Sequence, residues 1–215
     1  MIKDFINLFY PSFCAGCNNI LSTSERGICT NCWMELKKFD NSNNKCFFGR
    51  LKVESEFYAF EFVKNQILQK IIHQIKYKRN KFAAFVLGIE LGKIICSSSS
   101  NIDVIIPVPI SKKKKNIREF NQCDFIAKGV QQVIKKPILS DYLSRVNKMS
   151  SQINSGRYER WENVNKQFIR SGKSINFCHV LIIDDIVTSG ATIHECIKEF
   201  NEIFKISVGA VAKTK

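Results

Sequence analysis

The hydrophobic positions between residue 57 and the end of the chain follow two alternating patterns. Continuous apolar runs, typical of strands buried on both faces, occur at 57–63, 102–109, 180–185 and 206–212. Apolar residues at helical spacing occupy 65–78, 81–95, 126–134 and 192–204. Strands that alternate with helices predict an α/β fold, in which a mostly parallel sheet is covered by helices on both faces.

Three further segments fit this alternation less regularly. The segment 110–122, "ISKKKKNIREFNQ", predicts a basic loop after the strand at 102–109, and 137–146 predicts one more strand. Residues 147–165 are polar without a clean period and predict a long loop. Residues 1–45 are rich in turn formers, so we expect a small knuckle with its linker there and the α/β domain at 46–215.

The N-terminal segment contains two Cys-x-x-Cys pairs that are separated by eleven residues. Four thiolates can close a tetrahedral shell around Zn²⁺ with no open position, so we expect one structural zinc ion. Redox-active pairs and plain buried thiols are the alternatives. The expected zinc ligands are Cys14, Cys17, Cys29 and Cys32. The cysteines expected in the core are Cys96, Cys123, Cys178 and Cys196.

The net charge and the hydropathy of the chain indicate which kinds of binding partner and which cellular location to expect. The formal net charge is +14 over 215 residues, which favours nucleic acid or phosphorylated small molecules, with a solvated basic surface as the alternative. No run of about 18 apolar residues occurs, so no membrane span is expected. The N-terminus has no signal-peptide pattern, and we expect a cytoplasmic protein.

The segment "VLIIDDIVTSGAT", residues 180–192, combines a buried strand, two acids and a loop of small and hydroxyl residues. Ligands of parallel sheets bind at the carboxyl ends of the strands, where Asp184 and Asp185 are expected. Gly190 and Ala191 leave room for the backbone to approach a phosphate, to which nearby hydroxyls can donate. Carboxylates accept hydrogen bonds from vicinal hydroxyls, so the pattern indicates a phosphorylated sugar. The alternative is an ordinary helix cap.

This segment resembles the phosphoribosyl pyrophosphate (PRPP) signature of type I phosphoribosyltransferases. The resemblance implies that Asp184 and Asp185 contact the ribose hydroxyls at the catalytic centre, with Mg²⁺ arriving together with PRPP. It also implies that the loop binds the 5′-phosphate. The loop residues are Thr188, Ser189, Gly190, Ala191 and Thr192.

Other segments resemble one branch of that class, the ComF competence proteins. They are "PVP" at 107–109, "FNQ" at 120–122, "HQIKYKRN" at 73–80 and the cysteine knuckle. The resemblance implies that the segment around Pro109, with Lys112–Lys115 and Arg118, neutralises the pyrophosphate. It also implies a hood at 147–165 with Gln152 and Arg157 as substrate contacts. The family's arginine, any residue, arginine, glycine reads Asn116 to Glu119 here, which lacks the first arginine and the glycine.

Two classes of function follow from the resemblance. The first is a PRPP-binding protein that transfers a phosphoribosyl group, acting in DNA uptake during natural transformation. The second is a non-catalytic accessory protein that binds single-stranded DNA beside a competence helicase, with Trp33 and Trp161 as base-stacking aromatics. A PRPP-sensing regulator is a third possibility. No feature of the sequence identifies the acceptor.

Overall fold

A four-stranded parallel sheet forms the centre of the computed structural model, which describes residues 11–42, 48, 51, 53–98, 100–146, 167–171, 177–200 and 204–214. The strand order is β1-β6-β5-β2, and all three pairings are parallel. The strands are β1 (Val53–Phe62), β2 (Val104–Pro107), β5 (His179–Val187) and β6 (Lys205–Thr214). The α/β class with a parallel sheet, expected from the sequence, is therefore confirmed.

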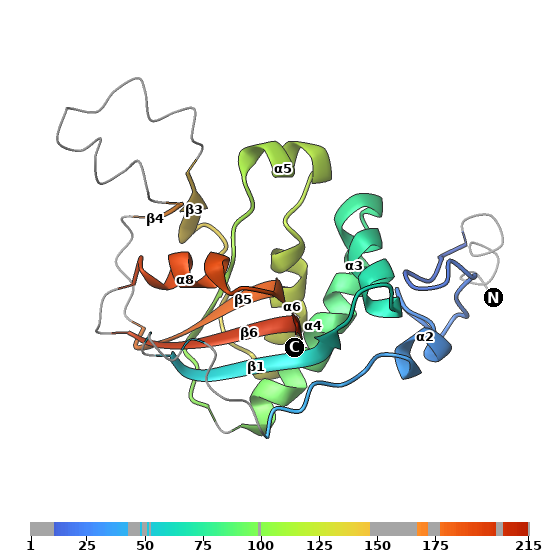
Figure 1. Cartoon of the computed structure of the whole chain (residues 1–215), viewed down its shortest axis with the longest axis horizontal. Coiled ribbons are helices and arrows are strands. Elements are labelled where there is room, and N and C mark those ends of the chain that lie inside the picture. The colour runs from blue at the N-terminus through green and yellow to red at the C-terminus, as the bar shows by residue number, and fades with distance from the viewer. Residues whose placement is uncertain are drawn as a thin grey trace.

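Helices cover both faces of the sheet, so that α4 and α8 lie on opposite sides of it in Figure 1. One face packs against α3 (Ile67–Lys78), α4 (Lys81–Ser97) and α6 (Gln122–Ile134). The other packs against α8 (Ala191–Ile197) and a small antiparallel sheet of β3 (Leu143–Arg145) and β4 (Phe168–Arg170). The described helices also include two shorter ones, α2 (Thr30–Met34) and α5 (Lys112–Arg118).

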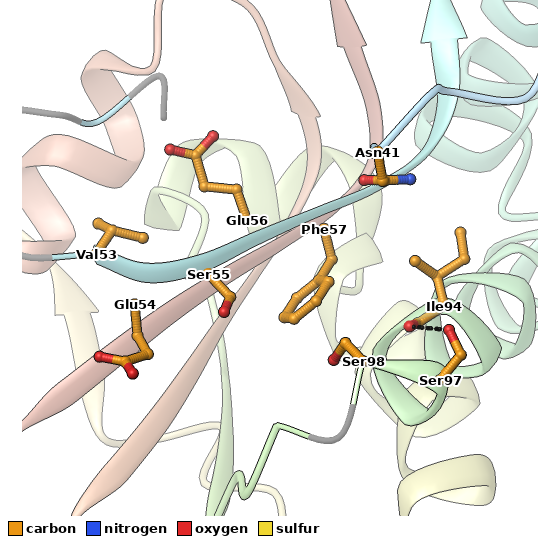
Figure 2. Close-up of a pocket in the computed structure, with 9 residues that line it drawn as sticks. All are labelled: Asn41, Val53, Glu54, Ser55, Glu56, Phe57, Ile94, Ser97 and Ser98. Atoms are coloured by element: carbon orange, nitrogen blue, oxygen red, sulfur yellow. Dashed lines mark hydrogen bonds between the residues drawn. The ribbon is translucent and has the colours of Figure 1, made fainter. Parts of the chain in front are cut away.

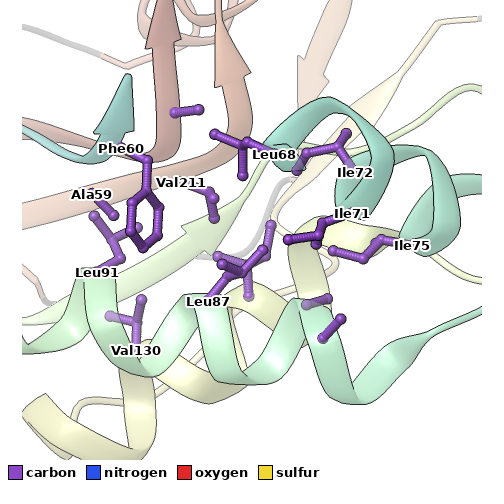
Figure 3. Packing of buried hydrophobic residues seen from close by; sticks show 14 of the residues in the cluster. Ala59, Phe60, Leu68, Ile71, Ile72, Ile75, Leu87, Leu91, Val130 and Val211 are labelled. Carbon is purple, nitrogen blue, oxygen red and sulfur yellow. The ribbon is translucent and has the colours of Figure 1, made fainter. Parts of the chain in front are cut away.

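The larger core cluster joins the N-terminal segment to the sheet. Figure 3 shows side chains of α3 and α4 directed toward Phe60 of β1 and Val211 of β6. Burying such aliphatic and aromatic side chains contributes about 1.5–3 kcal/mol each relative to leaving them exposed. The members from the N-terminal segment are Cys14, Ala15, Leu21, Ile28, Cys32 and Leu36.

Helices α4 and α6 cross with their backbones in contact, and glycines make this possible. A Cβ atom on Gly88 would lie 2.1 Å from the Ile126 carbonyl oxygen, and one on Gly129 would lie 2.1 Å from the Phe85 carbonyl oxygen. Any side chain at either position would therefore separate the helices. The crossing fixes how closely α6 approaches α4. Because α4 packs on the sheet, it also helps to fix the distance from α6 to the sheet.

Several expectations about single elements are wrong. Residues 112–118, expected in a loop, form α5, because the Ser111 side chain accepts from the Lys114 N–H and lysine tolerates helical backbone well. Of residues 137–146, only Leu143–Arg145 form a strand, and it is antiparallel. Helix α8 ends at Ile197, earlier than expected. The loop expected at 147–165 lies outside the described residues.

Two of the four cysteines expected in the core are not buried. Cys123 and Cys196 are buried, but Cys96 and Cys178 are exposed. Cys96 lies near the end of α4 and Cys178 just before β5, where each chain segment emerges from its packed layer. Within the described part of the chain, no helix has the length and apolar character needed to cross a bilayer.

Candidate functional site

Strand β5 continues past the acidic pair to Val187, so both aspartates lie within the strand rather than after it. Successive side chains of a strand point to opposite faces, and the two carboxylates accordingly have different partners. Both residues are buried, with exposed fractions of 8% for Asp184 and 6% for Asp185. We call these two residues and their polar partners the acid-pair site.

Asp185 is held by side chains from two helices. Its Oδ2 atom lies 2.7 Å from Nζ of Lys76 on α3 and accepts a hydrogen bond of 3.0 Å from Nε2 of Gln122 on α6. The oxygen of the Gln122 amide in turn accepts from Nη1 of Arg118, on α5, at 3.1 Å. A buried polar chain therefore links Asp185 to two cations on separate helices.

Asp184 has weaker polar support. Its Oδ1 accepts from the Asp185 backbone N–H at 2.8 Å and from the Cys123 thiol at 3.5 Å. Burial and then the charge of Asp185 raise the pKa of Asp184 to about 7, although the hydrogen bonds and the Lys76 charge oppose the rise. Asp184 can therefore exchange a proton near neutral pH.

The loop after β5 turns sharply into α8. Gly190 has φ of 69°, a left-handed conformation that a side chain disfavours, and it directly precedes Ala191, the first residue of α8. Thr188 and Ser189 are exposed, and Thr192 is half-buried. A small hollow of about 30 Å³ is lined by Asp184 and by residues 186–193. The structure thus brings the whole predicted phosphate loop to the side of Asp184.

The residues expected to bind pyrophosphate lie at different depths. Arg118 is buried, with its guanidinium carbon 5.3 Å from the centre of the Tyr77 ring, and it reaches the acid pair through Gln122. Pro109 is half-buried after β2, and Lys112 is exposed at the start of α5. Among the described residues, no contact joins Lys112 to the acid pair. Gln152 and Arg157 lie outside the described residues.

The position where the ComF pattern has glycine has a special backbone conformation. Glu119 has φ of 63° and forms the C-cap of α5. Glycine adopts this left-handed conformation readily, whereas other residues adopt it at a cost of about 1 kcal/mol. The Glu119 carboxylate forms an ion pair with Arg79, which is itself a left-handed C-cap, at the end of α3. Where the ComF pattern has a glycine, this chain therefore has a glutamate whose ion pair with Arg79 links α5 to α3.

Three members of the acid-pair site, Lys76, Gln122 and Cys123, were not expected there from the sequence. Lys76 follows Ile72 by four residues and Ile75 by one, so it flanks the apolar face of its helix. A lysine at the border of a buried face is a recognisable signal, because burial of its ammonium needs a partner. Gln122 and Cys123 lie in the first turn of α6, and sequence alone gives no indication that this turn meets β5.

The four N-terminal cysteines form a second site. Their sulfur atoms all lie within 4.8 Å of one another, so they could hold one zinc ion. A tetrahedral zinc–thiolate shell with bonds of about 2.3 Å has sulfur–sulfur distances of about 3.8 Å, and the distance from Cys17 to Cys29 is 3.7 Å. The donor set and its spacing therefore fit Zn²⁺.

Backbone groups support the thiolate form of Cys14, whereas burial raises the pKa of Cys32. The N–H groups of Gly16 and Cys29 donate to Sγ of Cys14 at 3.3 and 3.2 Å. Burial raises the pKa of Cys14, but backbone hydrogen bonds more than offset it and lower this pKa to about 7. A Cβ atom on Gly16 would lie 2.7 Å from Sγ of Cys32. The position just before Cys17 therefore has no room for a side chain.

A wider cavity lies elsewhere, beside the first half of β1. It holds about 360 Å³ and is lined by residues 53–57, Asn41 and the end of α4 (Figure 2). The acidic pair lies in the second half of β5, and β5 is parallel to β6, which pairs in parallel with β1. The cavity is thus at the amino ends of the strands, away from the acid-pair site. Size alone does not identify the functional site here.

Helices α3, α4 and α6 carry aromatic and cationic side chains. Tyr77 and Phe82 are 55% and 65% exposed. The Lys81 ammonium lies 5.4 Å from the centre of the Phe125 ring, and that of Lys128 lies 4.8 Å from it. We call these five residues the cationic aromatic face. Trp33, expected to be exposed, is half-buried against Phe60, and Trp161 lies outside the described residues.

Curated proteins provide the comparison with known functions. The chain is homologous to competence protein F of Haemophilus influenzae, with 23% identity over 88% of this chain and 91% of that protein. It is also homologous to DNA utilization protein YhgH: the Salmonella typhi protein is 26% identical, and that of Escherichia coli strain K12 is 25% identical. Each of these two alignments covers 60% of this chain and 58% of the relative. No protein-family model matches the chain.

Proposed function

We propose that the chain binds PRPP with Mg²⁺ at the acid-pair site and acts in the uptake or use of DNA. The observation that supports this most is the buried pair Asp184–Asp185 beside the loop 188–192. Two neighbouring buried acids destabilise each other, as the raised pKa of Asp184 reflects. Such perturbed groups are typical of functional sites, and here the Mg²⁺ bound with the ligand would offset the negative charge.

The proposed roles of the chain's residues follow from their chemistry. Carboxylates of Asp184 and Asp185 accept hydrogen bonds from the vicinal ribose hydroxyls. Backbone N–H groups and hydroxyls of 188–192 donate to the 5′-phosphate, and Gly190 keeps that approach free of a side chain. Mg²⁺, held largely by ligand oxygens and water, supplies positive charge at the diphosphate. Gln152 and Arg157 are proposed substrate contacts from the 147–165 segment.

If the chain is an enzyme, the reaction is transfer of the phosphoribosyl group. The bond from the anomeric carbon to pyrophosphate breaks, pyrophosphate leaves with the electron pair, and an acceptor nucleophile forms the new bond. Cations around the site, Lys76 and Arg118 among them, stabilise the negative charge of the leaving group. The regulator alternative uses the same binding site without this step.

Calorimetric titration with PRPP, with and without Mg²⁺, tests the proposal. Wild type is expected to bind in the presence of Mg²⁺, and Asp184→Asn/Asp185→Asn is expected to lose binding while keeping its fold by circular dichroism. Glu54→Gln is the matched control, because it removes one carboxylate beside the wider cavity at the other end of the strands. Equal binding by the double variant and wild type would rule out the acid-pair site.

A specific observation favours a second function, the binding of single-stranded DNA. Homologues of this chain bear the names competence protein F and DNA utilization protein YhgH, and the net charge is +14. On the cationic aromatic face, rings could stack with bases while lysines contact phosphates. Stacking contributes about 1–3 kcal/mol per base in such proteins. This function is compatible with PRPP binding in one protein.

Fluorescence anisotropy with a labelled oligothymidine at several salt concentrations tests this second function. Affinity should fall steeply with salt, and Tyr77→Ala/Phe82→Ala should weaken binding by about tenfold or more, as expected from the loss of stacking. Phe13→Ala/Met34→Ala removes two exposed apolar side chains from the cysteine-bearing segment and serves as control. The same loss in both double variants would place the DNA elsewhere.

A further inference from the structure

The Lys76–Asp185 ion pair has features that a purely structural pair does not need. Lys76 lies on the helix whose buried residues are Leu68, Ile71, Ile72 and Ile75. Replacing a buried ion pair with apolar residues often leaves a protein equally stable, because burying two charges costs their hydration free energy. The lysine side chain is 22% exposed while that of Asp185 is 9% exposed. The lysine side chain is therefore the more accessible member of the pair.

The surroundings of the pair favour a role in ligand binding. Asp185 has a second donor in Gln122, which is fixed by Arg118. Its conformation is therefore restrained from α3, α5 and α6 at once. Among the described residues, Lys76 has Asp185 as its one ion-pair partner. The other two N–H bonds of the ammonium can then donate to ligand oxygens. With Asn116 in place of the family's first arginine, Lys76 is the cation that contacts the acid pair directly in the part of the chain that the structure describes.

We propose that Lys76 is a positioning residue of the acid-pair site: from α3 it fixes the Asp185 carboxylate for the ligand's hydroxyls and balances its charge. The inference rests on the proposed function, since it assigns a role within the same site. The acid-pair site and its surroundings contain these titratable and charged groups: Asp184 and Asp185 of β5, Lys76 of α3, Arg118 of α5, Cys123 of α6 and Cys196 of α8.

The pH dependence of the site separates this role from a merely structural one. Lys76 is among the groups that lower the pKa of Asp184, which burial and the Asp185 charge raise. Lys76→Met should therefore move the titration of Asp184 to higher pH, and Lys76→Arg should leave it near its wild-type value. Lys70→Met, an exposed lysine two turns earlier on α3, is the matched control and should change nothing.

Two measurements on the whole 215-residue chain test the inference. The first is carbon-13 NMR of the aspartate carboxyls against pH without ligand. The second is calorimetric titration with PRPP and Mg²⁺ at pH 7 and pH 8.5. Lys76→Met is expected to weaken binding by about tenfold to a hundredfold at pH 7, the usual range for losing a charged hydrogen bond. The deficit should be smaller at pH 8.5, where a larger share of Asp184 is ionised in both proteins.

The outcomes are distinct. A Lys76→Met protein that is less stable but titrates and binds as wild type does would overturn the inference and reduce Lys76 to a structural role. If wild type itself binds no PRPP at either pH, the proposed function fails. The ligand-free titration would then still decide whether Lys76 controls the charge of the pair: an unshifted Asp184 titration refutes the inference, and a shifted one upholds it for whatever ligand the site takes.

Discussion

The cysteine cluster and the acid-pair site differ in how the chain assembles them. All four thiols come from residues 14–32, and their sulfurs converge because two short Cys-x-x-Cys turns face each other. The acid-pair site draws on β5, α3, α5 and α6, with Gln122 and Asp185 separated by 63 residues. The first site depends on local backbone geometry and could hold a metal ion. The second depends on how whole layers of the fold pack.

The two sites also differ in what they contribute to stability. Zinc binding to a closed thiolate shell favours the folded state directly. Burial of adjacent carboxylates opposes folding, and the ion pair with Lys76 compensates only in part. The difference suggests that the cysteine cluster is retained for structure and the acidic pair for its ligand. The three predictions that follow separate these two contributions.

The largest effect is expected from loss of a zinc ligand. Cys32→Ser should lower the free energy of unfolding by at least about 3 kcal/mol, because it removes a metal ligand and a buried member of the main core. Thermal unfolding and zinc content by mass spectrometry measure it. Cys96→Ser replaces an exposed thiol, so its unfolding temperature and its zinc content should equal those of wild type. Unchanged stability in Cys32→Ser would show that zinc contributes nothing to this fold.

A smaller effect of opposite sign is expected at the acid pair. The pKa of Asp184 rises on folding from 3.8 to about 7, mainly through burial. The folded state therefore holds more protons than the unfolded state between these values, so Asp184 makes stability fall as pH rises through them. Asp184→Asn should be more stable than wild type at pH 8, by about 1–3 kcal/mol.

Denaturant unfolding at pH 8 and pH 5 measures this difference. The advantage of Asp184→Asn should shrink at pH 5, where the wild-type carboxyl is largely protonated. Glu54→Gln, at an exposed acid, should show no such pH-dependent gain. An Asp184→Asn protein that is less stable at both pH values would mean that the carboxylate is a structural asset, as the cysteines are.

The smallest effect is expected at Glu119. Glu119→Gly should change the free energy of unfolding by less than about 1 kcal/mol, because relief of the left-handed backbone is offset by loss of the exposed ion pair with Arg79. Glu119→Ala loses the ion pair without the backbone relief, so it should be less stable than Glu119→Gly. Urea unfolding of the two variants tests this order, and the reverse order would contradict the backbone explanation.

The difference between the two sites also explains how far the sequence could predict them. Spacing alone identified the cysteine cluster, because its ligands are neighbours in the chain. The period of the apolar runs predicted the parallel sheet, and it placed Asp184 and Asp185 near the end of β5. The partners of the acid pair could not be predicted in this way. Lys76 meets Asp185 only because α3 packs against the sheet, and this depends on tertiary contacts.

The lysine run shows a different limit. Lys112–Lys115 were expected in a loop because clustered charges are typical of solvated segments. The same residues form helical backbone readily once Ser111 caps the first turn. All four lysines are exposed. The expectation about the backbone was wrong, because charge and helix propensity are separate properties of lysine.

The glycine crossing of α4 and α6 has a genetic consequence. Gln122 and Cys123, which contact the acid pair, lie about two turns from Gly129 on the same helix. A random-mutagenesis screen for lost function should therefore recover substitutions at Gly88 and Gly129, neither of which contacts the acid pair. Variants with alanine there should keep their function at low temperature and lose it at high temperature, so that a map of damaging alleles would outline a larger site than the ligand itself touches.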